Sequence, residues 1–444
     1  MNLLLLANIL NGTLCGNDAT FSRIVIDSRT VQPGDCFFAI KGEFFDGHDF
    51  LGDIEQKKAA VAIVDRQVAL SIPTIQVENT KTALINLARF YRESVSIPVV
   101  GITGSCGKTT TRALIEHILK QAGNVLASQK SFNNDIGLPL TLFQLKPEHD
   151  FAVLEIGTNH PGEIAALTAI AAPTISVVTM VAGVHVEGFG SLQKIAEEKS
   201  DIYKTADIAI INADDPFSAL FRKRAEGARI ITFGIHHPAD VMAKEILINE
   251  NGCAQFTLLM PLCDAPCITL PLLGEHNVTN ALAAAAIAFA LRIPIEKIKM
   301  GLETAAPEYG RLTIKKGLSG STIIDDSYNA NPTSVEAAIK ILTNRSDHAI
   351  LVFGDMKELG DIAESSHHYI GECALKQGVK QLFCYGENSA FAAKAFGKNA
   401  FHFMDQQALI DALKPALTKE VTVLVKGSNG MKMINIVNQI VDSH

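Results

Sequence analysis

The sequence predicts an α/β protein of several domains, with sheets built largely from parallel strands. The chain has 444 residues, and single hydrophobic cores rarely grow past roughly 250–300 residues, so two or three domains are expected. A short β-branched segment near residue 99 leads through a glycine-rich turn into a helical pattern. In the last third of the chain, apolar strand-like segments end in polar residues and are followed by helical segments. That order indicates a doubly wound sheet with its ligand crevice along the strand ends.

Residues 1–97 are expected to form a small α/β domain. Residues 24–26 and 36–40 have the composition of strands, and turn residues separate them. Several basic side chains lie at predicted strand ends and loops, where anion-binding groups usually lie: Arg29, Lys41 and His48. A solvated basic trio that binds no ligand explains the same pattern equally well.

The composition argues against several classes of protein. The formal net charge of −8 and the lack of a basic stripe argue against nucleic acid as the main partner. The eight cysteines have no framework spacing, so we expect reduced thiols in a cytoplasmic enzyme and no zinc site. Residues 1–10 are apolar but follow no basic region, which favours a buried helix over a signal peptide. The other apolar runs are too short to span a membrane, so no stable membrane insertion is expected.

Residues 97–110 have the strand–loop–helix order of a phosphate-binding loop. Backbone N–H groups of such a loop wrap the phosphates, and the helix N-terminus adds a positive dipole. Lys108 would reach the outer phosphates, and the Thr109 hydroxyl can ligate Mg²⁺. The match to G-x-x-x-x-G-K-[ST] is imperfect, because Ile102 stands where the first glycine is expected. Nucleotide binding is nevertheless favoured over an ordinary βα turn, so we expect the protein to use a nucleoside triphosphate.

Polar residues near other predicted strands and helices supply candidate ligands. Glu155 ends an apolar strand-like segment and is a candidate second Mg²⁺ ligand; an exposed strand end or a helix cap is the alternative. His185 follows another such segment, where it is either a metal ligand or general base, or a structural histidine. Asn277 and Asn280 share one face of a helical turn, where their amides would read a base or ribose, with helix capping by Asn277 as the alternative.

The third region begins near residue 311 and repeats the strand–polar loop–helix pattern. Its segments at residues 322–332, 349–360 and 421–428 each place polar side chains directly after an apolar run. Because carboxyl ends of parallel strands meet at one edge of a sheet, these side chains are expected to line one crevice.

Together these stretches resemble the Mur ligases, the ATP-dependent amide-forming enzymes of peptidoglycan precursor synthesis. Residues 103–109 look like the family's own variant of the phosphate loop, which explains the displaced first glycine. Residues 133–137, 325–332 and 354–360 look like the branch that adds D-alanyl-D-alanine to UDP-N-acetylmuramoyl-tripeptide. The branch that adds diaminopimelate or lysine shares the Asp-Ser-Arg element at residues 27–29 but has different loops at the last two places. The similarity covers essentially the whole chain.

The resemblance implies three domains with separate tasks. A small α/β N-terminal domain (residues 1–97) would bind the UDP-muramoyl substrate, and a central domain with a P-loop ATPase-like parallel sheet (98–310) would bind ATP. A C-terminal Rossmann-like doubly wound domain (311–444) would complete the enzyme. The implied cofactors are ATP and two Mg²⁺ ions, and the implied substrates are UDP-N-acetylmuramoyl-tripeptide and D-alanyl-D-alanine. We expect a cytoplasmic monomer.

The resemblance also implies a role for each matching residue. Lys108, His185 and Lys199 would be catalytic, and Lys199 matches the lysine that becomes a carbamate in these ligases. The metal ligands would be Thr109, Glu155, His185 and Lys199. The nucleotide would be held by Thr103, Gly104, Ser105, Cys106, Gly107, Lys108, Thr109, Thr110, Asn277, Asn280, Arg311 and Asp326. The other substrates would be held by Ser28, Arg29, Lys41, Gly42, His48, Asn133, Asn134, Asp135, Tyr328, Asn329, Asn331, Lys426 and Ser428.

In the implied reaction, ATP phosphorylates the tripeptide carboxylate and the amine of D-alanyl-D-alanine attacks the acyl phosphate. Mg²⁺ and Lys108 would neutralise charge on the transferring phosphoryl group. Two alternatives remain open: another amide ligase of the superfamily, either tripeptide-forming or folylpolyglutamate-type, and an ATP-dependent switch. The switch would hydrolyse ATP without an acceptor, and residues 27–29 count against the folylpolyglutamate type.

Overall fold

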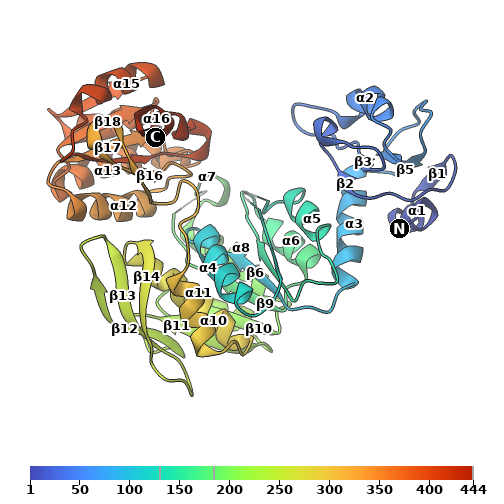
Figure 1. Cartoon of the computed structure of the whole chain (residues 1–444), viewed down its shortest axis with the longest axis horizontal. Helices are drawn as coiled ribbons and strands as arrows, with labels where there is room; N and C mark the ends of the chain where they lie inside the picture. Colours follow the sequence, from blue (N-terminus) through green and yellow to red (C-terminus); the bar gives the residue numbers. More distant parts are fainter. Residues whose placement is uncertain (130–131, 184–185, 443–444) are drawn as a thin grey trace. The chain divides into compact units, whose positions relative to one another are not determined.

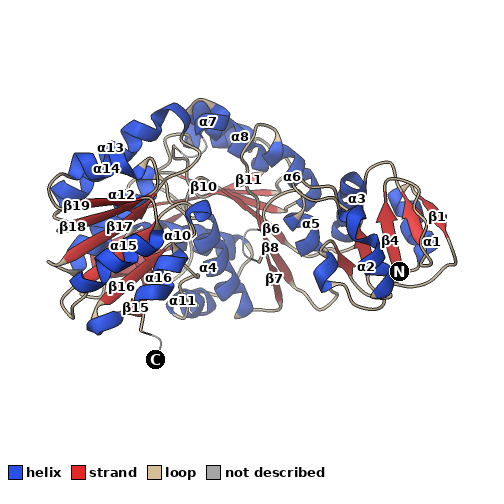
Figure 2. Cartoon of the chain, turned by 90° about the horizontal axis from the view of Figure 1, so that it is seen from above, coloured by secondary structure: helices blue, strands red, loops and turns tan. Residues whose placement is uncertain are grey.

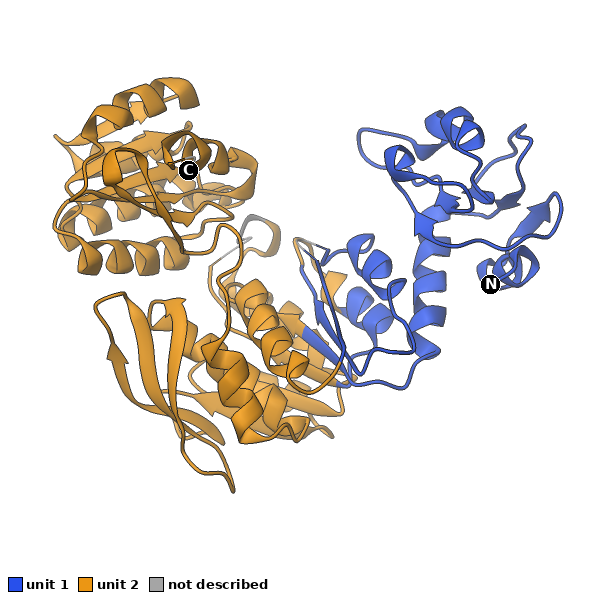
Figure 3. Ribbon diagram, viewed as in Figure 1, with its two compact units in different colours: residues 1–101, 124–157, 165–174 blue, residues 102–123, 158–164, 175–444 orange. Residues whose placement is uncertain are grey.

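The computed structural model describes residues 1–129, 132–183 and 186–442 of the chain. These residues form three β-sheets with helices packed against them (Figure 1). The described part divides into two compact units (Figure 3). The first unit consists of residues 1–101, 124–157 and 165–174. The second unit consists of residues 102–123, 158–164 and 175–444. The division runs through strand β6 (Val99–Thr103), so each unit includes strands of the second sheet.

The first sheet has the strand order β1-β5-β4-β3-β2, and only β1 runs antiparallel to its neighbour among the described strands. Its elements are β1 (Thr13–Cys15), β2 (Ile24–Val25), β3 (Cys36–Phe38), β4 (Val61–Val64), β5 (Thr74–Gln76), α1 (Leu3–Leu10), α2 (Leu51–Gln56) and α3 (Thr80–Glu93). Alternate side chains of a strand face opposite sides, so Phe38 packs with α1 and α3 while Phe37 packs with α2. Helix α1 confirms the predicted buried N-terminal helix, because Leu3, Leu6 and Leu10 lie in the core.

The second sheet has the strand order β14-β13-β12-β11-β10-β9-β6-β8-β7. Its other strands are β7 (Val125–Ala127), β8 (Phe151–Glu155), β9 (Ile175–Val178), β10 (Ile208–Asn212), β11 (Arg229–Gly234), β12 (Val241–Ile248), β13 (Cys253–Leu259) and β14 (Cys267–Leu273). Its helices are α4 (Lys108–Lys120), α5 (Gly137–Leu142), α6 (Glu163–Ala171), α7 (Val186–Phe189), α8 (Leu192–Ser200), α9 (Ser218–Arg224), α10 (His276–Ala290) and α11 (Ile295–Glu303). Strands β9 to β12 pair parallel, whereas β12, β13 and β14 pair antiparallel.

Helix α10 is the alanine-rich segment of the sequence, and it packs directly against α4. Its alanines from Ala281 to Ala288 are buried. Small side chains let the backbones of two helices approach closely, and this approach brings the first turns of α4 and α10 together. The helix therefore positions the loop that precedes α4.

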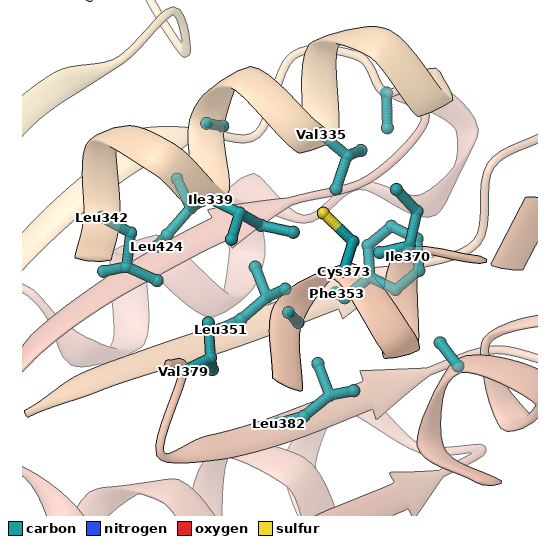
Figure 4. Close-up of a cluster of buried hydrophobic side chains, with 14 of the residues drawn as sticks. Val335, Ile339, Leu342, Leu351, Phe353, Ile370, Cys373, Val379, Leu382 and Leu424 are labelled. Carbon is teal, nitrogen blue, oxygen red and sulfur yellow. The ribbon is translucent and has the colours of Figure 1, made fainter. Parts of the chain in front are cut away.

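The third sheet has the strand order β15-β16-β20-β17-β18-β19, with β15 antiparallel and the other described neighbours parallel. Its elements are β15 (Thr313–Lys316), β16 (Thr322–Asp326), β17 (Ala349–Gly354), β18 (Gln381–Tyr385), β19 (Ala400–Phe403), β20 (Thr422–Lys426), α12 (Pro332–Arg345), α13 (Ala363–Gln377), α14 (Ser389–Phe396), α15 (Gln406–Leu413) and α16 (Ile434–Ile440). Helices cover both of its faces (Figure 2). On one face Val335, Ile339 and Ile370 pack over Leu351 and Phe353 (Figure 4).

The structure confirms the predicted α/β class and the doubly wound third sheet. The polar segments predicted to share one edge follow β16, β20 and β17, which are direct neighbours. The antiparallel part of the second sheet, β12 to β14, was not predicted, so that sheet is mixed rather than purely parallel. The proposed domain boundaries after residues 97 and 310 stay a prediction.

Two further features concern the chain as a whole. Within the described ranges, no helix is both long and apolar enough to cross a membrane. All eight cysteines lie in those ranges, and each is a free thiol.

Candidate active site

The loop between β6 and α4 lies so close to its neighbours that glycine is required at two positions. Gly104 (φ +152°) and Gly107 (φ +83°) adopt backbone conformations that disfavour a side chain. A Cβ atom on Gly104 would overlap the hydroxyl oxygen of Thr179, and one on Gly107 would overlap the side-chain oxygen of Asn280. The Thr179 hydroxyl also donates to the Cys106 carbonyl over 2.5 Å. The loop backbone is therefore held from both sides.

Helix α4 starts directly after this loop, as a phosphate-binding loop requires. Gly107 is its N-cap and supplies no side-chain hydrogen bond, and the N-terminus of a helix is a favourable position for an anion. The Lys108 ammonium lies over the loop and donates to the Gly104 carbonyl over 2.6 Å. Ser105 is tied to the segment after β9 by its backbone and its hydroxyl, which donate to the carbonyls of Met180 and Ala182.

The first turns of α4 and α10 are joined by a chain of buried amides. The Thr111 hydroxyl donates to Asn280 over 3.2 Å, Asn280 donates to Asn277 over 2.8 Å, and Asn277 donates to the Leu273 carbonyl over 2.8 Å. Asn277 and Asn280 are both buried. Their predicted contact with a base or ribose stays a prediction; in this structure their amides position Gly107 and the helix that follows it.

Lys199, in α8, is a buried lysine beside a second lysine. Its side chain is among the largest that are fully buried. Burial and, to a smaller extent, the neighbouring Lys108 ammonium together lower the pKa of Lys199 to about 7, although Glu198 opposes the shift. The Glu198 carboxylate already accepts two hydrogen bonds, from the backbone N–H groups of Gly162 and Ile164, at 2.8 Å each. A substantial fraction of Lys199 is therefore a neutral amine near pH 7, where an exposed lysine would be an ammonium. His185, predicted to act beside it, lies outside the described residues.

In the first unit, Glu155 ends β8 as a buried carboxylate. It accepts the side-chain amide of Asn133 over 3.1 Å, and its own backbone N–H donates to the Ser128 hydroxyl. Asn134 instead caps the start of α5 by accepting the Gly137 N–H over 2.8 Å, and Asp135 pairs with Lys81. Of the predicted polar trio at 133–135, the structure thus brings only Asn133 to the carboxylate.

At the edge of the third sheet, Asp326 and Lys426 form a buried ion pair. These residues face each other at the ends of β16 and β20, with 2.5 Å between the Asp326 carboxylate and the Lys426 ammonium. Lys426 also donates to the Asn329 carbonyl over 2.9 Å. Both were predicted to contact ligands. Removing one partner of such a buried pair typically costs roughly 3–5 kcal/mol, so the pair also fixes the loop after β16.

That loop is joined to the phosphate loop and to the segment before β15. Asn331 caps α12 in a reciprocal capping box, and its amide nitrogen lies 3.2 Å from the Cys106 sulfur. The Arg311 guanidinium stacks over the Tyr328 ring, 4.3 Å from its centroid. Ser428 accepts the Lys357 backbone N–H over 2.8 Å. The structure therefore brings these predicted residues of the third region to the same edge.

At the carboxyl edge of the first sheet, the predicted residues differ in their exposure to solvent. Arg29 pairs with Asp27 at 2.7 Å and is mostly exposed, while the carbonyl of Ser28 accepts the Lys57 ammonium. Lys41 and Gly42 are exposed. His48 is buried, with only 2% of its side chain exposed, and lies between two carboxylates. A direct substrate contact by His48 stays a prediction.

Sequence reasoning missed several residues that organise these edges, namely Thr179, Asp46, Asp65 and Arg66. Thr179 directly follows β9, and it reaches the phosphate loop only because β9 lies beside β6, a strand order that the sequence pattern did not establish. Asp46 stands two residues before His48, a spacing that favours a local side-chain to backbone hydrogen bond. Asp65 and Arg66 gave no such signal. Their role depends on strand order, which pattern reasoning did not establish.

The described ranges contain no group of three or more His, Cys, Asp or Glu side chains placed to hold a metal ion. Mg²⁺ in nucleotide enzymes is held by one or two protein oxygens together with phosphates and water. Thr109 and Glu155 carry oxygen donors of this kind.

Comparison with protein families divides the chain in the same sequence order as its three sheets. Residues 20–96 match the model described as Mur ligase family, catalytic domain. Residues 102–288 match the Mur ligase middle domain, and residues 310–429 match the Mur ligase glutamate ligase domain.

Known relatives and solved structures agree with these matches. The chain is 37% identical to UDP-N-acetylmuramoyl-tripeptide–D-alanyl-D-alanine ligase of Escherichia coli (strain K12), covering 98% of this chain and 97% of the relative. It is 33% identical to the enzyme of that name from Bacillus subtilis (strain 168), covering 99% and 98%. The crystal structure of MurF from Acinetobacter baumannii superposes with a TM-score of 0.91 at 33% identity, covering 98% and 97%. MurF ligase from Thermotoga maritima, solved in complex with ADP, gives 0.84 at 27% identity, covering 94% and 96%. The chain belongs to the Mur ligase family.

Proposed function

We propose that this protein is an ATP-dependent ligase that joins D-alanyl-D-alanine to UDP-N-acetylmuramoyl-tripeptide. The observation that carries the proposal is identity over nearly the full chain: relatives bearing this name are 36–37% identical and cover 98% of it. The product would be the UDP-linked pentapeptide used in peptidoglycan synthesis, released with ADP and phosphate. The reaction needs ATP and two soluble substrates, and we place it in the cytoplasm of the cell.

The phosphate loop supports the ATP half of the reaction. Its glycine-rich backbone leads directly into the N-terminus of α4, whose dipole favours an anion. Lys108, which rests on the Gly104 carbonyl, would exchange that oxygen for a phosphate oxygen. We further assign nucleotide contacts to the other predicted residues: Thr103, Ser105, Cys106, Thr110, Asn277, Asn280, Arg311 and Asp326.

Bond formation in this proposal proceeds through an acyl phosphate. The terminal phosphoryl group of ATP moves to the tripeptide carboxylate, so that a carboxylate oxygen becomes part of a good leaving group. The dipeptide amine then attacks the carbonyl carbon, and phosphate departs with that oxygen. Positioning the reactants contributes most, since correct orientation can lower a barrier by roughly 7–11 kcal/mol. We assign that task to the polar edges of the first and third sheets.

Mg²⁺ would be held by the oxygen donors of Thr109 and Glu155, with His185 as a further predicted ligand. Asn133 orients the Glu155 carboxylate by donating a hydrogen bond to it. Residues that hydrogen-bond to a metal ligand commonly fix its orientation in this way. When bound, the ion would neutralise charge on the transferring phosphoryl group. We propose two such ions, as the family resemblance implies.

Lys199 is the fourth candidate metal ligand, and it would bind the metal as a carbamate. Its neutral amine nitrogen would attack the carbon of CO₂, form a nitrogen–carbon bond and release one proton. The group would then carry a negative charge and two oxygens in place of an ammonium. Burial and Lys108 both favour the neutral amine over the ammonium, and an anion beside Lys108 would remove the repulsion between the two lysines.

We expect the protein to act as a monomer, and its formal net charge of −8 argues against nucleic acid as a partner. Light scattering coupled to size-exclusion chromatography measures the mass of the active species. A mass near the 47.7 kDa of one chain supports the proposal, and a stable larger mass would contradict it.

Phosphate release and product mass test the proposed function together. We expect phosphate release from ATP to require both UDP-N-acetylmuramoyl-tripeptide and D-alanyl-D-alanine, and the muramoyl product to gain the mass of the dipeptide minus water. Release without the dipeptide would instead indicate an ATP-dependent switch. Coupling of another acceptor with none of the dipeptide would point to a sister ligase.

Gly107→Ala tests the role of the phosphate loop. The added Cβ would displace Asn280, so we expect the KM for ATP to rise roughly tenfold or more, which corresponds to about 1.4 kcal/mol of lost binding. Gly227→Ala is the matched control, because Gly227 also has a positive φ (+93°) but nothing within 4 Å of the added atom. If the two variants raised the KM for ATP equally, backbone strain alone would explain the loss of ATP binding, and the contact with Asn280 would play no part.

Nuclear magnetic resonance with ¹³C-labelled bicarbonate tests the carbamate. We expect one carbamate signal that grows from pH 6 to pH 8, because the fraction of neutral amine rises through a pKa of about 7. The signal should vanish in Lys199→Met and persist in Lys194→Met, which removes an exposed lysine of the same helix. A signal that survives in Lys199→Met would refute the assignment.

A further inference from the structure

Tyr203 places a hydroxyl group inside the second sheet, one helical turn after Lys199. Helix α8 continues with helical backbone angles into a 3₁₀ turn (Asp201–Tyr203), and residues three or four apart in such a run share a face. Both residues are buried, with 2% of Lys199 and 1% of Tyr203 exposed. The two side chains therefore enter the interior from the same side of the helical run.

The Tyr203 hydroxyl joins strand β9 to strand β10. It accepts the Val178 backbone N–H over 2.9 Å and donates to the Ile210 carbonyl over 2.8 Å. Val178 is the last residue of β9, and Ile210 lies in β10, the parallel neighbour of β9. A hydroxyl that is held by a donor on one strand and an acceptor on the next has one defined position. The last turn of the helical run is therefore fixed relative to both strands.

Burial of the ring does not account for this hydroxyl. A phenylalanine would pack equally well on Phe221, whose ring centroid lies 5.9 Å from that of Tyr203. Neighbouring parallel strands normally bond to each other directly, and a hydroxyl in a core is costly unless it is hydrogen-bonded. The hydroxyl therefore contributes a defined position, which an apolar ring alone does not specify.

The strand end that Tyr203 holds is itself fixed by side chains from the end of β10. The Asn212 amide donates to the Thr179 carbonyl over 3.1 Å, and the Asp215 carboxylate accepts the Val181 N–H over 2.8 Å. Asn212 and Asp215 are both buried. The hydroxyl thus anchors the helical run to a part of the sheet that is already held in place.

Both ends of this connection belong to the proposed active site. Strand β9 ends one residue before Thr179, whose hydroxyl donates to the carbonyl of Cys106 in the phosphate loop over 2.5 Å. Lys199 lies close enough to the Lys108 ammonium for the two charges to interact. The Tyr203 hydroxyl therefore links the strand end that supports the phosphate loop to the helix that carries Lys199.

We propose that Tyr203 is a positioning residue for the carbamate of Lys199. Its hydroxyl holds α8 at the depth and rotation that keep the Lys199 nitrogen beside Lys108. The inference rests on the proposed function for the carbamate itself, in which the amine and CO₂ form a nitrogen–carbon bond and release one proton to water. The Lys108 ammonium attracts a carbamate that is held beside it, whereas a displaced carbamate loses this attraction and reverts more readily to amine and CO₂.

Tyr203→Phe tests the proposal, because it removes the hydroxyl oxygen and keeps the ring. We expect the concentration of ¹³C-labelled bicarbonate that gives half of the maximal carbamate signal to rise roughly tenfold, which corresponds to about 1.4 kcal/mol. The full signal should return at saturating bicarbonate, and kcat should recover over the same range of concentrations. A role in stability alone would not make either quantity depend on bicarbonate in this way.

Thr232→Val is the matched control. The Thr232 hydroxyl, in β11 of the same sheet, donates one hydrogen bond to Asp240 over 2.8 Å and accepts another from it over 2.9 Å. Losing a buried hydroxyl of this kind should lower the temperature of unfolding of both variants, but only Tyr203→Phe should need more bicarbonate.

Three results would overturn the proposal. The first is a bicarbonate requirement that Tyr203→Phe leaves unchanged. The second is an equal rise in Tyr203→Phe and Thr232→Val, which would show a general effect of lost stability. The third is a failure of Tyr203→Phe to fold, which would show that the hydroxyl serves the stability of the whole sheet.

The outcomes separate this inference from the proposed function. If the wild-type protein forms the amide product and Tyr203→Phe takes up CO₂ as readily, the function stands and the positioning proposal fails. If the wild-type protein forms no amide product, the function fails, and the carbamate signal still decides whether Tyr203 governs CO₂ uptake by Lys199. If the wild-type protein gives no carbamate signal, this inference fails, while amide formation still decides the function.

Discussion

The close approach of the phosphate loop to its neighbours is the constraint on which the rest of the second unit depends. Gly104 lies against Thr179 and Gly107 lies against Asn280, so neither position has room for a side chain. The order of strands β6 and β9 and the packing of α10 on α4 are what create those contacts. A loop held this way does not have to be ordered when a ligand binds, which lowers the entropic cost of binding. The alanines of α10 therefore contribute to the core and also allow the close packing on α4 that positions the phosphate loop.

Polar side chains at the sheet edges hold one another in place. Asp326 pairs with Lys426, Asn277 bonds to Asn280, and His48 lies between two carboxylates. Buried polar groups are costly unless they are paired, so each pair fixes the conformation of the loop that carries it.

Local chemistry was predictable from the sequence, whereas partners distant in the chain were not. The strand, turn and helix around Lys108 follow from short-range patterns, and so do the polar ends of β16, β17 and β20. The structure shows that Thr179, Asp65 and Arg66 matter because strand order brings them to loops far away in the sequence, and no local pattern encodes that order. The antiparallel strands β12 to β14 were missed for a similar reason, since residues 241–273 carry no motif that attracted attention. Solvent exposure could not be predicted from the sequence either, because His48 has a side chain that can bind ligands but is buried in the structure.

The central claim is that the tripeptide carboxylate is activated by phosphorylation before the amide forms. Tripeptide labelled with ¹⁸O in the reacting carboxylate tests it most directly, because one labelled oxygen must leave with phosphate when the dipeptide amine attacks. Mass spectrometry of the released phosphate should therefore show one ¹⁸O atom per phosphate, and the amide product should retain the other. Phosphate without label, with its new oxygen drawn from water, would show that ATP is hydrolysed separately from bond formation and would contradict the account.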